Sequence, residues 1–481
     1  IMKTKNNIRI TAYLFLCMSL FSCSQDFLET KSSTDLGDKL IYKTTASTRG
    51  VLYGIYKYMR SWGCTPHVRM DCCGLHTNLL TFDVMGTDIT MQPGTWYWYD
   101  YDYWHTGSET EFKTDHFWRF YYIIINNCNN ILFYIDDAEG PVSEKEAIAG
   151  EARALRAFAY FHLIQLYQQT YTIAKQMPGV PLYTTPAKGN AENNPRASVE
   201  KIYKVITTDL EKAVLSLPTQ RESKYYINAN VAAGILARVY LTMGRWHEAA
   251  AMAQQARAGY PLMSAEQWTE GFNNMSNPEW IWGIHQTSTE NVGWGSTFSI
   301  LDFERGDQKS FRINDKLVEK YSDTDVRGTL ITPVGSLLGN RKFREPATLN
   351  IGHMVLMRSS EMLLIEAEAS AKDGDETHAQ DLLYELQAKR DPNARKTDRK
   401  GNELIELILL ERRKELWAEG FSLFDLLRNQ KSLVREGDHQ SLKNFPANSW
   451  KFIFQIPRSE LDVNKGILPE DQNPNTGVYT Y

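Results

Sequence analysis

The fold of this chain is decided by residues 233–261, which read AGILARVYLTMGRWHEAAAMAQQARAGYP. Ala237 is followed three residues later by Tyr240, and Ala249 comes twelve residues after Ala237. Met243-Gly244-Arg245 supplies a turn between two runs of apolar residues at helical spacing. Small residues at these positions let two antiparallel helices approach closely, while the tyrosine ring fills the groove between them. The segment therefore predicts a tightly packed helical hairpin.

The spacing of this hairpin matches a tetratricopeptide unit, and two weaker copies occur elsewhere in the chain. One includes Ala367, with Ala379 twelve residues further on. The other is indicated by Ala157, Tyr160 and a helix that starts at Ser198, with a long insertion between its parts. Arrays of such hairpins stack into a curved scaffold that binds rather than catalyses. Generic amphipathic hairpins are the alternative interpretation.

Apolar residues recur at helical spacing through most of the chain, so the predicted fold class is mainly α, a helical-hairpin scaffold with long irregular loops and few short strands. The predicted helices are Thr45–Arg60, His116–Ile135, Ser143–Gln168, Ser198–Leu217, Asn228–Met243, Trp246–Ala258, Asn314–Tyr321, Ser359–Lys372, Glu376–Lys389, Glu403–Ala418 and Phe421–Asn429. The predicted strands are Trp280–His285, Met354–Arg358 and Phe452–Ile456. Ser198 is expected to cap its helix, and Ser143 with Glu146 is expected to form a capping box.

Composition excludes several classes of protein. The 481 residues carry 53 Lys and Arg against 58 Asp and Glu, a net charge of −5, which argues against a nucleic-acid-binding protein. Hydrophobic residues make up 42% of the chain, enough for a large core. The sequence contains no Cys-x-x-Cys, Gly-x-Ser-x-Gly or His-Glu-x-x-His motif and no phosphate loop. We therefore expect no metal, no cofactor and no catalytic residues.

The first residues have the pattern of a targeting segment. Lys3, Lys5 and Arg9 form a basic start, and Ile10–Phe21 is an apolar stretch too short to span a bilayer. The stretch ends in Leu20-Phe21-Ser22-Cys23, which resembles a bacterial lipobox. We expect residues 1–22 to be a lipoprotein signal peptide and Cys23 to be acylated. A plain secretory signal with an incidental cysteine is the alternative.

Several sequence blocks resemble one family in a shared order. They are Asp26-Phe27-Leu28, Phe117–Asn129, Gly150–Phe161 (GEARALRAFAYF), Gly179–Leu182, Pro195–Val199, Asp209–Ala213, Arg358–Ala369 (RSSEMLLIEAEA), Glu411–Gly420 (ERRKELWAEG) and Gln472-Asn473-Pro474. On these blocks the chain resembles the SusD/RagB family of outer-membrane nutrient-binding lipoproteins of Bacteroidota. One block alone would be weak, but their order along nearly the whole mature chain is specific.

The resemblance implies a single SusD-like domain over residues 23–481. Its helical scaffold would comprise roughly residues 40–60, 116–258 and 359–429, and its loop-rich ligand-binding part roughly residues 61–115 and 259–358. The resemblance also implies a lipid-anchored protein of the outer membrane that faces the cell surface. Such a protein captures oligosaccharide, or sometimes peptide, for a SusC-like TonB-dependent β-barrel transporter. Ligand-contacting residues vary within the family and are not carried over by motif.

The segment Trp96–Trp104 stands out, because seven of its nine residues are aromatic. Flat rings with polar rims suit sugars, which stack their C–H faces on the rings, and exposed aromatic clusters mark binding sites. Packing of about half of the rings beneath the loop is the alternative. The candidate ligand-binding residues are Trp96, Trp98, Tyr99, Tyr101, Trp294, Asp83, Asp88 and Arg69. Trp280 and Trp282 share a strand face and are expected in the core.

Two other functions compete with glycan binding. A glycoside hydrolase needs two carboxylates across a cleft, and Asp100 and Asp102 are more simply hydrogen-bond acceptors. A purely structural docking subunit would use the helical scaffold alone. In the block 411–420 the charged residues are expected to pair within their helix and to belong to a buried Arg–Glu network that holds the scaffold in register.

Overall fold

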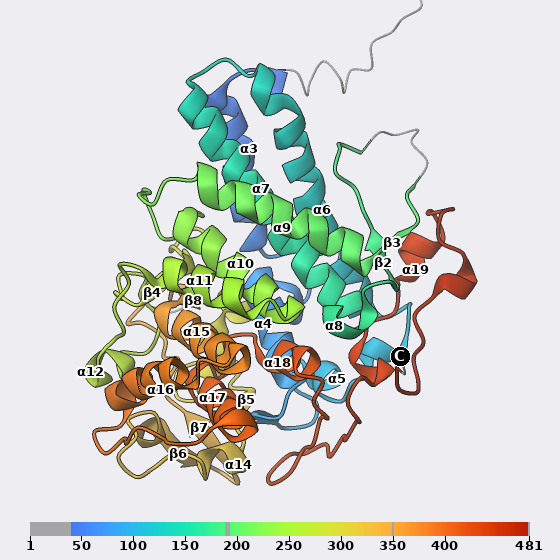
Figure 1. The fold of residues 1–481 in the computed structure, drawn as a ribbon. Helices are drawn as coiled ribbons and strands as arrows, with labels where there is room; N and C mark the ends of the chain where they lie inside the picture. Colours follow the sequence, from blue (N-terminus) through green and yellow to red (C-terminus); the bar gives the residue numbers. More distant parts are fainter. Residues whose placement is uncertain (1–39, 188–192, 349–350, 480–481) are drawn as a thin grey trace, which may run out of the picture.

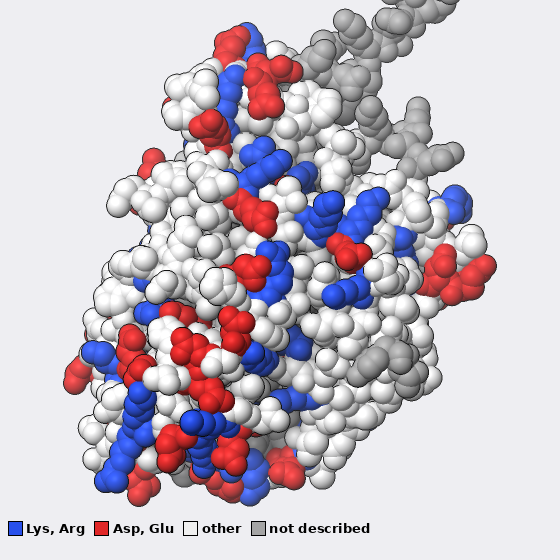
Figure 2. All heavy atoms as spheres, viewed as in Figure 1, with Lys and Arg blue, Asp and Glu red and all other residues white. Residues whose placement is uncertain are grey.

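A computed structural model describes residues 40–187, 193–348 and 351–479 (Figure 1). The predicted signal peptide, residues 1–22, and the predicted acylation site Cys23 lie outside these residues. Within them, no helix combines the length and the hydrophobicity that crossing a membrane would require. Lys and Arg alternate with Asp and Glu over the face seen in Figure 2, in keeping with the small net charge.

Helical hairpins form the scaffold, as the sequence predicts. In the hairpin quoted above, α10 (Ala229–Met243) packs on α11 (Trp246–Arg257), and Gly244 makes the turn with φ 75°. The second copy is α15 (Ser359–Asp373) with α16 (Glu376–Arg390). The third pairs α7 (Val142–Tyr167) with α9 (Val199–Ser216), whose start is capped by the Ser198 side chain.

The hairpins stack into one continuous array. The helix α7 contacts α3 (Thr45–Met59) and α6 (Phe112–Tyr134) on one side and α9 on the other. From α9 the packing continues through α10, α11 and α15 to α17 (Gly401–Glu415), and Figure 1 shows this succession running from α3 at the top to α17 near the bottom. Small residues in α10, among them Ala233 and Ala237, are fully buried where the neighbouring helices meet.

Strands are short and lie mainly beside the scaffold. A four-stranded antiparallel sheet has the order β1 (Ile89–Met91), β5 (Phe311–Ile313), β7 (Leu337–Asn340) and β6 (Ile331–Val334). It joins the segments 61–115 and 259–358, which are far apart in the sequence. Two further antiparallel pairs are β4 (Trp280–Ile284) with β8 (Met354–Arg358), and β2 (Pro178–Pro181) with β3 (Arg196–Ser198). Trp280 and Trp282 are buried, as predicted.

The other elements are short. The α-helices are α4 (Leu75–Val84), α5 (Trp98–Tyr101), α8 (Tyr171–Ala174), α12 (Ala265–Trp268), α13 (Thr297–Leu301), α14 (Asp315–Val318), α18 (Ser422–Arg428) and α19 (Arg458–Leu461). The 3-10 turns are η2 (Met70–Cys72), η3 (His105–Gly107), η4 (Ile135–Asp137), η5 (Gly293–Gly295), η6 (Gly328–Leu330), η7 (Trp450–Phe452) and η8 (Pro469–Asp471).

Three local predictions were wrong. Residues 452–456 form no strand, because they are buried against the end of α7, where Phe454 N–H donates to the Leu166 carbonyl. The predicted helix 314–321 shortens to the single turn α14. The Ser143 capping box is absent because α7 begins one residue earlier, with Pro141 at its N-cap. The Glu144 carboxylate accepts a hydrogen bond from Thr45 instead.

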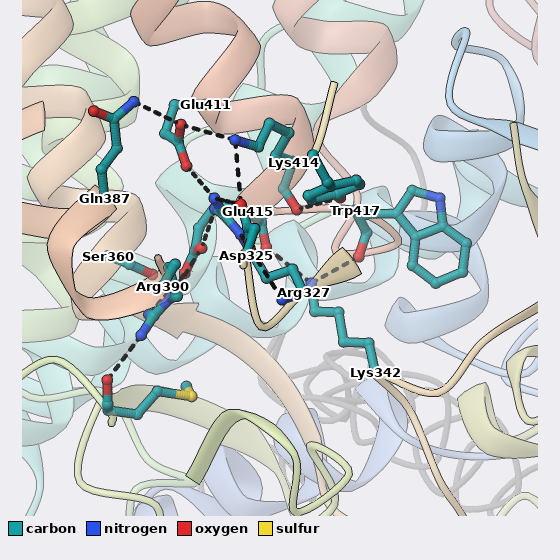
Figure 3. Close-up of polar contacts among 12 residues, drawn as sticks. Asp325, Arg327, Lys342, Ser360, Gln387, Arg390, Glu411, Lys414, Glu415 and Trp417 are labelled. Atoms are coloured by element: carbon teal, nitrogen blue, oxygen red, sulfur yellow. Dashed lines mark hydrogen bonds and ion pairs between the residues drawn. The ribbon is translucent and has the colours of Figure 1, made fainter. Parts of the chain in front are cut away.

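A buried network of charged residues joins the scaffold to the loop-rich part (Figure 3). Its basic members are Arg327, Lys342, Arg358, Arg390 and Lys414, and its acidic members are Glu279, Asp325, Glu411, Glu415 and Glu419. At its centre the Glu415 carboxylate accepts from the guanidinium groups of Arg327, Arg358 and Arg390 at 2.7–2.9 Å. A charge this deep is tolerated only when it is paired and hydrogen-bonded.

This network confirms the predicted Arg–Glu cluster but corrects its geometry. The helix α17 ends at Glu415, so Glu419 lies outside it and pairs with Lys342 and Arg358 from other segments. Arg412 pairs with Asp425 in α18, outside its own helix. Apart from the Glu411–Lys414 contact, the ion pairs of residues 411–419 connect different elements, and all but the Arg412–Asp425 pair join elements that are distant in sequence. Helical spacing alone misses such pairs because it describes only neighbours on one helix.

Candidate functional site

Arg69 lies at the centre of the candidate site. It precedes η2, and its guanidinium carbon is 4.0 Å from the centre of the Phe112 ring and 5.1 Å from that of Trp96. Its Nε donates to the carboxylate of the buried Asp71 at 3.2 Å. The rings and this hydrogen bond together hold the guanidinium plane in place, while 37% of the side chain remains exposed. The sequence named Arg69 and Trp96 and did not name Phe112.

The aromatic segment 96–104 is anchored by three of its four tyrosines. Tyr97, Tyr101 and Tyr103 are buried, and the Tyr101 hydroxyl and His439 Nδ1 share a hydrogen bond of 2.7 Å. Tyr97 and Tyr103 adopt positive φ values of 71° and 58°, which fold the segment into the turn α5 rather than an extended strand. Tyr101 is thereby placed in the core, away from the surface where a ligand could bind.

Two of the other rings of this segment, those of Tyr99 and Trp104, face outward. Tyr99 is 55% exposed and Trp104 is 62% exposed, with their ring centres 6.4 Å apart. The His105 ring connects them to Arg69, because its centre lies 5.7 Å from that of Tyr99 and 4.7 Å from that of Phe112. Trp98 is half-buried against Tyr101, with ring centres 5.4 Å apart.

Trp294 reaches the same area from the second loop-rich segment. It is 63% exposed and sits in η5, which packs against η2 just after Arg69. A side chain at Gly295 would bring Cβ within 2.5 Å of Cys73 Sγ and 3.1 Å of the Trp62 ring, so only glycine fits. His76, in α4, donates from Nε2 to the Gly295 carbonyl at 2.8 Å and fixes the turn from below.

We call this region the aromatic surface. It comprises Trp62, Arg69, Trp96, Tyr99, Trp104, Phe112 and Trp294. Beneath it, the fully buried Lys113 ammonium lies 3.8 Å from the carboxylates of both Asp71 and Asp100. Burial lowers the pKa of Lys113 and these carboxylates raise it, with a net upward direction that keeps the ammonium charged. A buried cluster of ion pairs, in which Lys113 offsets the charges of Asp71 and Asp100, therefore lies beneath the aromatic surface.

Asp83 and Asp88 lie elsewhere. Both line a groove of about 750 Å³ bordered by α14, α17 and α18, and both are buried. Asp83 accepts from the Gly420 and Ser422 amides at 2.6 and 3.0 Å, and burial raises its pKa to about 7 despite these bonds. Asp88 pairs with Arg413 at 2.6 Å. These two carboxylates tie the 83–88 segment to the scaffold.

The structure thus brings together five of the eight predicted ligand-binding residues. Trp96, Tyr99, Trp294 and Arg69 belong to the aromatic surface, and Trp98 borders it. Trp62 and Phe112 lie outside the dense aromatic cluster, and only their position in the segment 61–115 hinted at a role. Trp104 was part of the cluster but was not selected. In the described part of the chain, no group of three or more His, Cys, Asp and Glu residues could hold a metal ion, and Cys64, Cys72, Cys73 and Cys128 are free thiols.

Comparisons with known proteins identify the family. Residues 26–241 match a family described as "Starch-binding associating with outer membrane", of SusD-like type, and residues 340–475 match the SusD family. A SusD-like carbohydrate binding protein from Bacteroides vulgatus has the same fold, with a TM-score of 0.82 and 29% identity over 91% of this chain and all of that one. This chain belongs to the SusD/RagB family.

Two curated relatives come from Formosa agariphila. SusD-like protein P38 is 22% identical over 90% of this chain and 93% of its own length. SusD-like protein P2 is 27% identical over 50% of this chain, and the matched part spans only 44% of P2. Both relatives carry the family name, and the match to P38 extends over nearly the whole of each protein.

Proposed function

We propose that this protein captures oligosaccharides on its aromatic surface at the cell surface and delivers them to a SusC-like TonB-dependent transporter. The observation that carries this proposal is the gathering of aromatic rings from two loop-rich segments, some exposed and two, Phe112 and Trp96, packed on Arg69. Aromatic side chains with polar tips suit the apolar faces and hydroxyl rims of sugars. The relative from Bacteroides vulgatus, named as carbohydrate binding, supports the same ligand class.

The location of the protein is part of the proposal. The matched family is described as associating with the outer membrane, and the Leu20–Cys23 pattern supports an acyl anchor at Cys23. Mass spectrometry of the N-terminus of protein purified from its native membrane tests this point. Cys23 carrying two or three acyl chains is expected, and an unmodified N-terminus would contradict the anchor.

A non-catalytic role fits the chemistry of the site. The carboxylates beneath the rings, Asp71 and Asp100, are buried and engaged with Arg69, Lys113 and His105. A glycosidase needs one carboxylic acid and one carboxylate facing a bound sugar across a cleft. The buried pair at this site instead holds these neighbouring donor side chains in position.

Affinity electrophoresis and isothermal titration with a set of polysaccharides test the function. Retention of at least one glycan without release of shortened products supports capture. Release of shortened products would favour a hydrolase, and failure to retain any glycan would leave only a docking role. Pull-down with the partner barrel, in the presence and absence of a retained glycan, tests delivery.

A further inference from the structure

The Arg69 guanidinium has unused hydrogen-bonding capacity. Its Nε donates to Asp71, but Nη1 and Nη2 have no acceptor among the residues that the structure describes. Contacts with Phe112 and Trp96 leave the edge of the guanidinium plane free to donate. Two parallel donors in a fixed plane match the two oxygens of a carboxylate or a sulfate. Because the plane is already held, little side-chain entropy is lost on binding.

The charged side chains around Arg69 differ in their exposure to solvent. Asp71, Asp100 and Lys113 are all buried, whereas Arg69 is partly exposed and lies outermost. The buried carboxylates are shared among several donors, with Asp100 accepting from Nδ1 of His105 at 2.8 Å and Asp71 contacting both Arg69 and Lys113. A ligand approaching the rings therefore meets the cation first, and the compensating negative charge lies behind it.

We propose that Arg69 anchors an anionic group, so that the ligand of the aromatic surface is an acidic glycan carrying uronate or sulfate. This inference rests on the proposed glycan-binding function and narrows it. The rings stack on the sugar backbone, and the free Nη1 and Nη2 of Arg69 donate to the anionic group. An aromatic surface without such a donor pair would give no preference between charged and neutral sugars.

Glu111 is a partly exposed acidic side chain beside the aromatic surface. Its Oε2 lies 3.9 Å from Nε2 of His105, the residue whose ring packs on Phe112. Its charge opposes an incoming anion, so Glu111→Gln is expected to strengthen binding of an acidic glycan about twofold to threefold. The same change is expected to leave binding of a neutral glycan unaltered. Opposite effects at Glu111 and Arg69 would distinguish electrostatic recognition from a change in ring packing.

The first experiment uses the full folded chain and chemically matched glycans. Chondroitin sulfate is compared with its desulfated and its carboxyl-reduced forms, and polygalacturonate with its carboxyl-reduced form, alongside neutral glucans, mannans and xylans. Retention in affinity gels and titration at about 50 and about 500 mM NaCl are measured, because salt screens exposed charges. We expect an acidic form to bind at least about tenfold more tightly than its neutral counterpart and to weaken in salt. The desulfated and carboxyl-reduced arms distinguish sulfate from carboxylate.

The second experiment changes the cation. Arg69→Gln is expected to lower affinity for the acidic glycan about tenfold or more, and Arg69→Lys to restore only part of it, because lysine keeps the charge but not the planar pair of donors. Arg341→Gln is the matched control: this arginine directly follows β7, is 41% exposed, pairs with Glu304 and lies 5.9 Å from the centre of the Phe303 ring. Melting temperatures of all variants are recorded.

The outcomes distinguish the inference that the glycan is acidic from the broader proposal that the protein captures glycans. Selective retention of acidic forms that depends on Arg69 and not on Arg341 supports the inference. Equal binding of acidic and neutral forms, or equal losses in the two arginine variants, overturns the inference and leaves glycan capture standing. Retention of no glycan in the whole set overturns both. If Arg69→Gln does not fold, the matched glycans and the salt response of the unchanged protein still decide the question.

Discussion

Arg358 and Arg69 each lie against two aromatic rings and pair with at least one carboxylate, but Arg358 is buried and Arg69 is partly exposed. Arg358 has no exposed surface, and its Nε, Nη1 and Nη2 all donate to acceptors, among them Glu279, Glu415 and Glu419. Arg69 is 37% exposed and uses only Nε within the described chain. The protein itself supplies acceptors for every nitrogen of the Arg358 guanidinium, while Arg69 keeps two nitrogens that can donate to another molecule.

Burial and the number of free donors distinguish the buried network from the aromatic surface more clearly than residue type does. Both regions combine arginine, carboxylates and aromatic rings, so composition alone does not distinguish them. In the buried network, an unpaired donor would cost the full desolvation of a charged group. At the aromatic surface, water satisfies the free donors until a ligand replaces it. The predictions below test each side of this comparison.

The largest effect is expected at the centre of the buried network. Glu415→Ala leaves the guanidinium groups of Arg327, Arg358 and Arg390 without their shared acceptor and should cost about 3–5 kcal/mol of unfolding free energy. Urea denaturation measures this cost. Glu406→Ala on the same helix is the control, since its pair with Lys431 is exposed. A loss at Glu415 no larger than that at Glu406 would contradict the assigned role of the network.

Acid should weaken the link between the core and the aromatic surface. Burial lowers the pKa of His76 to about 4, and its Nδ1 has no partner within the described residues to accommodate an added proton. Because the unfolded chain takes up this proton first, the contribution of the neutral His76 to the free energy of unfolding is complete above about pH 6.5, and about 3 kcal/mol of it is lost as the pH falls towards 4.

Denaturation of the wild type and of His76→Gln across this pH range measures the effect. The variant should lose less stability between pH 6.5 and 4 than the wild type does. His247→Gln is the exposed control, with 86% of its side chain accessible, and should respond as the wild type does. If the wild type and His76→Gln lost the same stability on acidification, protonation of His76 would not be a cause of the loss.

Loss of rings should affect binding rather than stability. Trp96→Ala and Trp294→Ala should each weaken a retained glycan by about 2 kcal/mol, roughly thirtyfold, because aromatic anchors dominate binding energy. Trp98→Ala should weaken it less, since the turn α5 directs that ring against Tyr101. Titration of each variant, with the melting temperature as control, measures this order. Full affinity in the variant lacking all three tryptophans would exclude the aromatic surface as the site.

The smallest effect on stability is expected at the exposed ion pair between Arg341 and Glu304. Like Arg358 and Arg69, Arg341 combines a carboxylate partner with a nearby aromatic ring. Arg341→Gln removes a 2.6 Å contact with Glu304 but should change stability by less than about 1 kcal/mol, because surface ion pairs are screened and mobile. Thermal denaturation measures the change. A cost approaching that of Glu415→Ala would show that burial is not what distinguishes the network from other ion pairs.

The sequence predicted the scaffold well because its information is local. Ala237, Tyr240 and Ala249 lie on two adjacent helices, and their spacing alone indicates how these helices pack. The cap at Ser198 and the strand Met354–Arg358 were also correct. The strands β1, β5, β6 and β7 were missed because three or four residues carry too little periodicity to predict a strand.

By itself, the sequence determined the helical-hairpin class, the family resemblance and the presence of an unusual aromatic cluster. Only the tertiary structure decided which rings of that cluster face outward, since positive φ values at Tyr97 and Tyr103 make a turn where alternation assumed an extended strand. It also assigned Asp83 and Asp88 to a separate groove, placed Phe112 against Arg69 and packed the turn that carries Trp294 against η2, the turn that follows Arg69. These contacts join residues up to more than two hundred positions apart, and local spacing contains no information about such pairs.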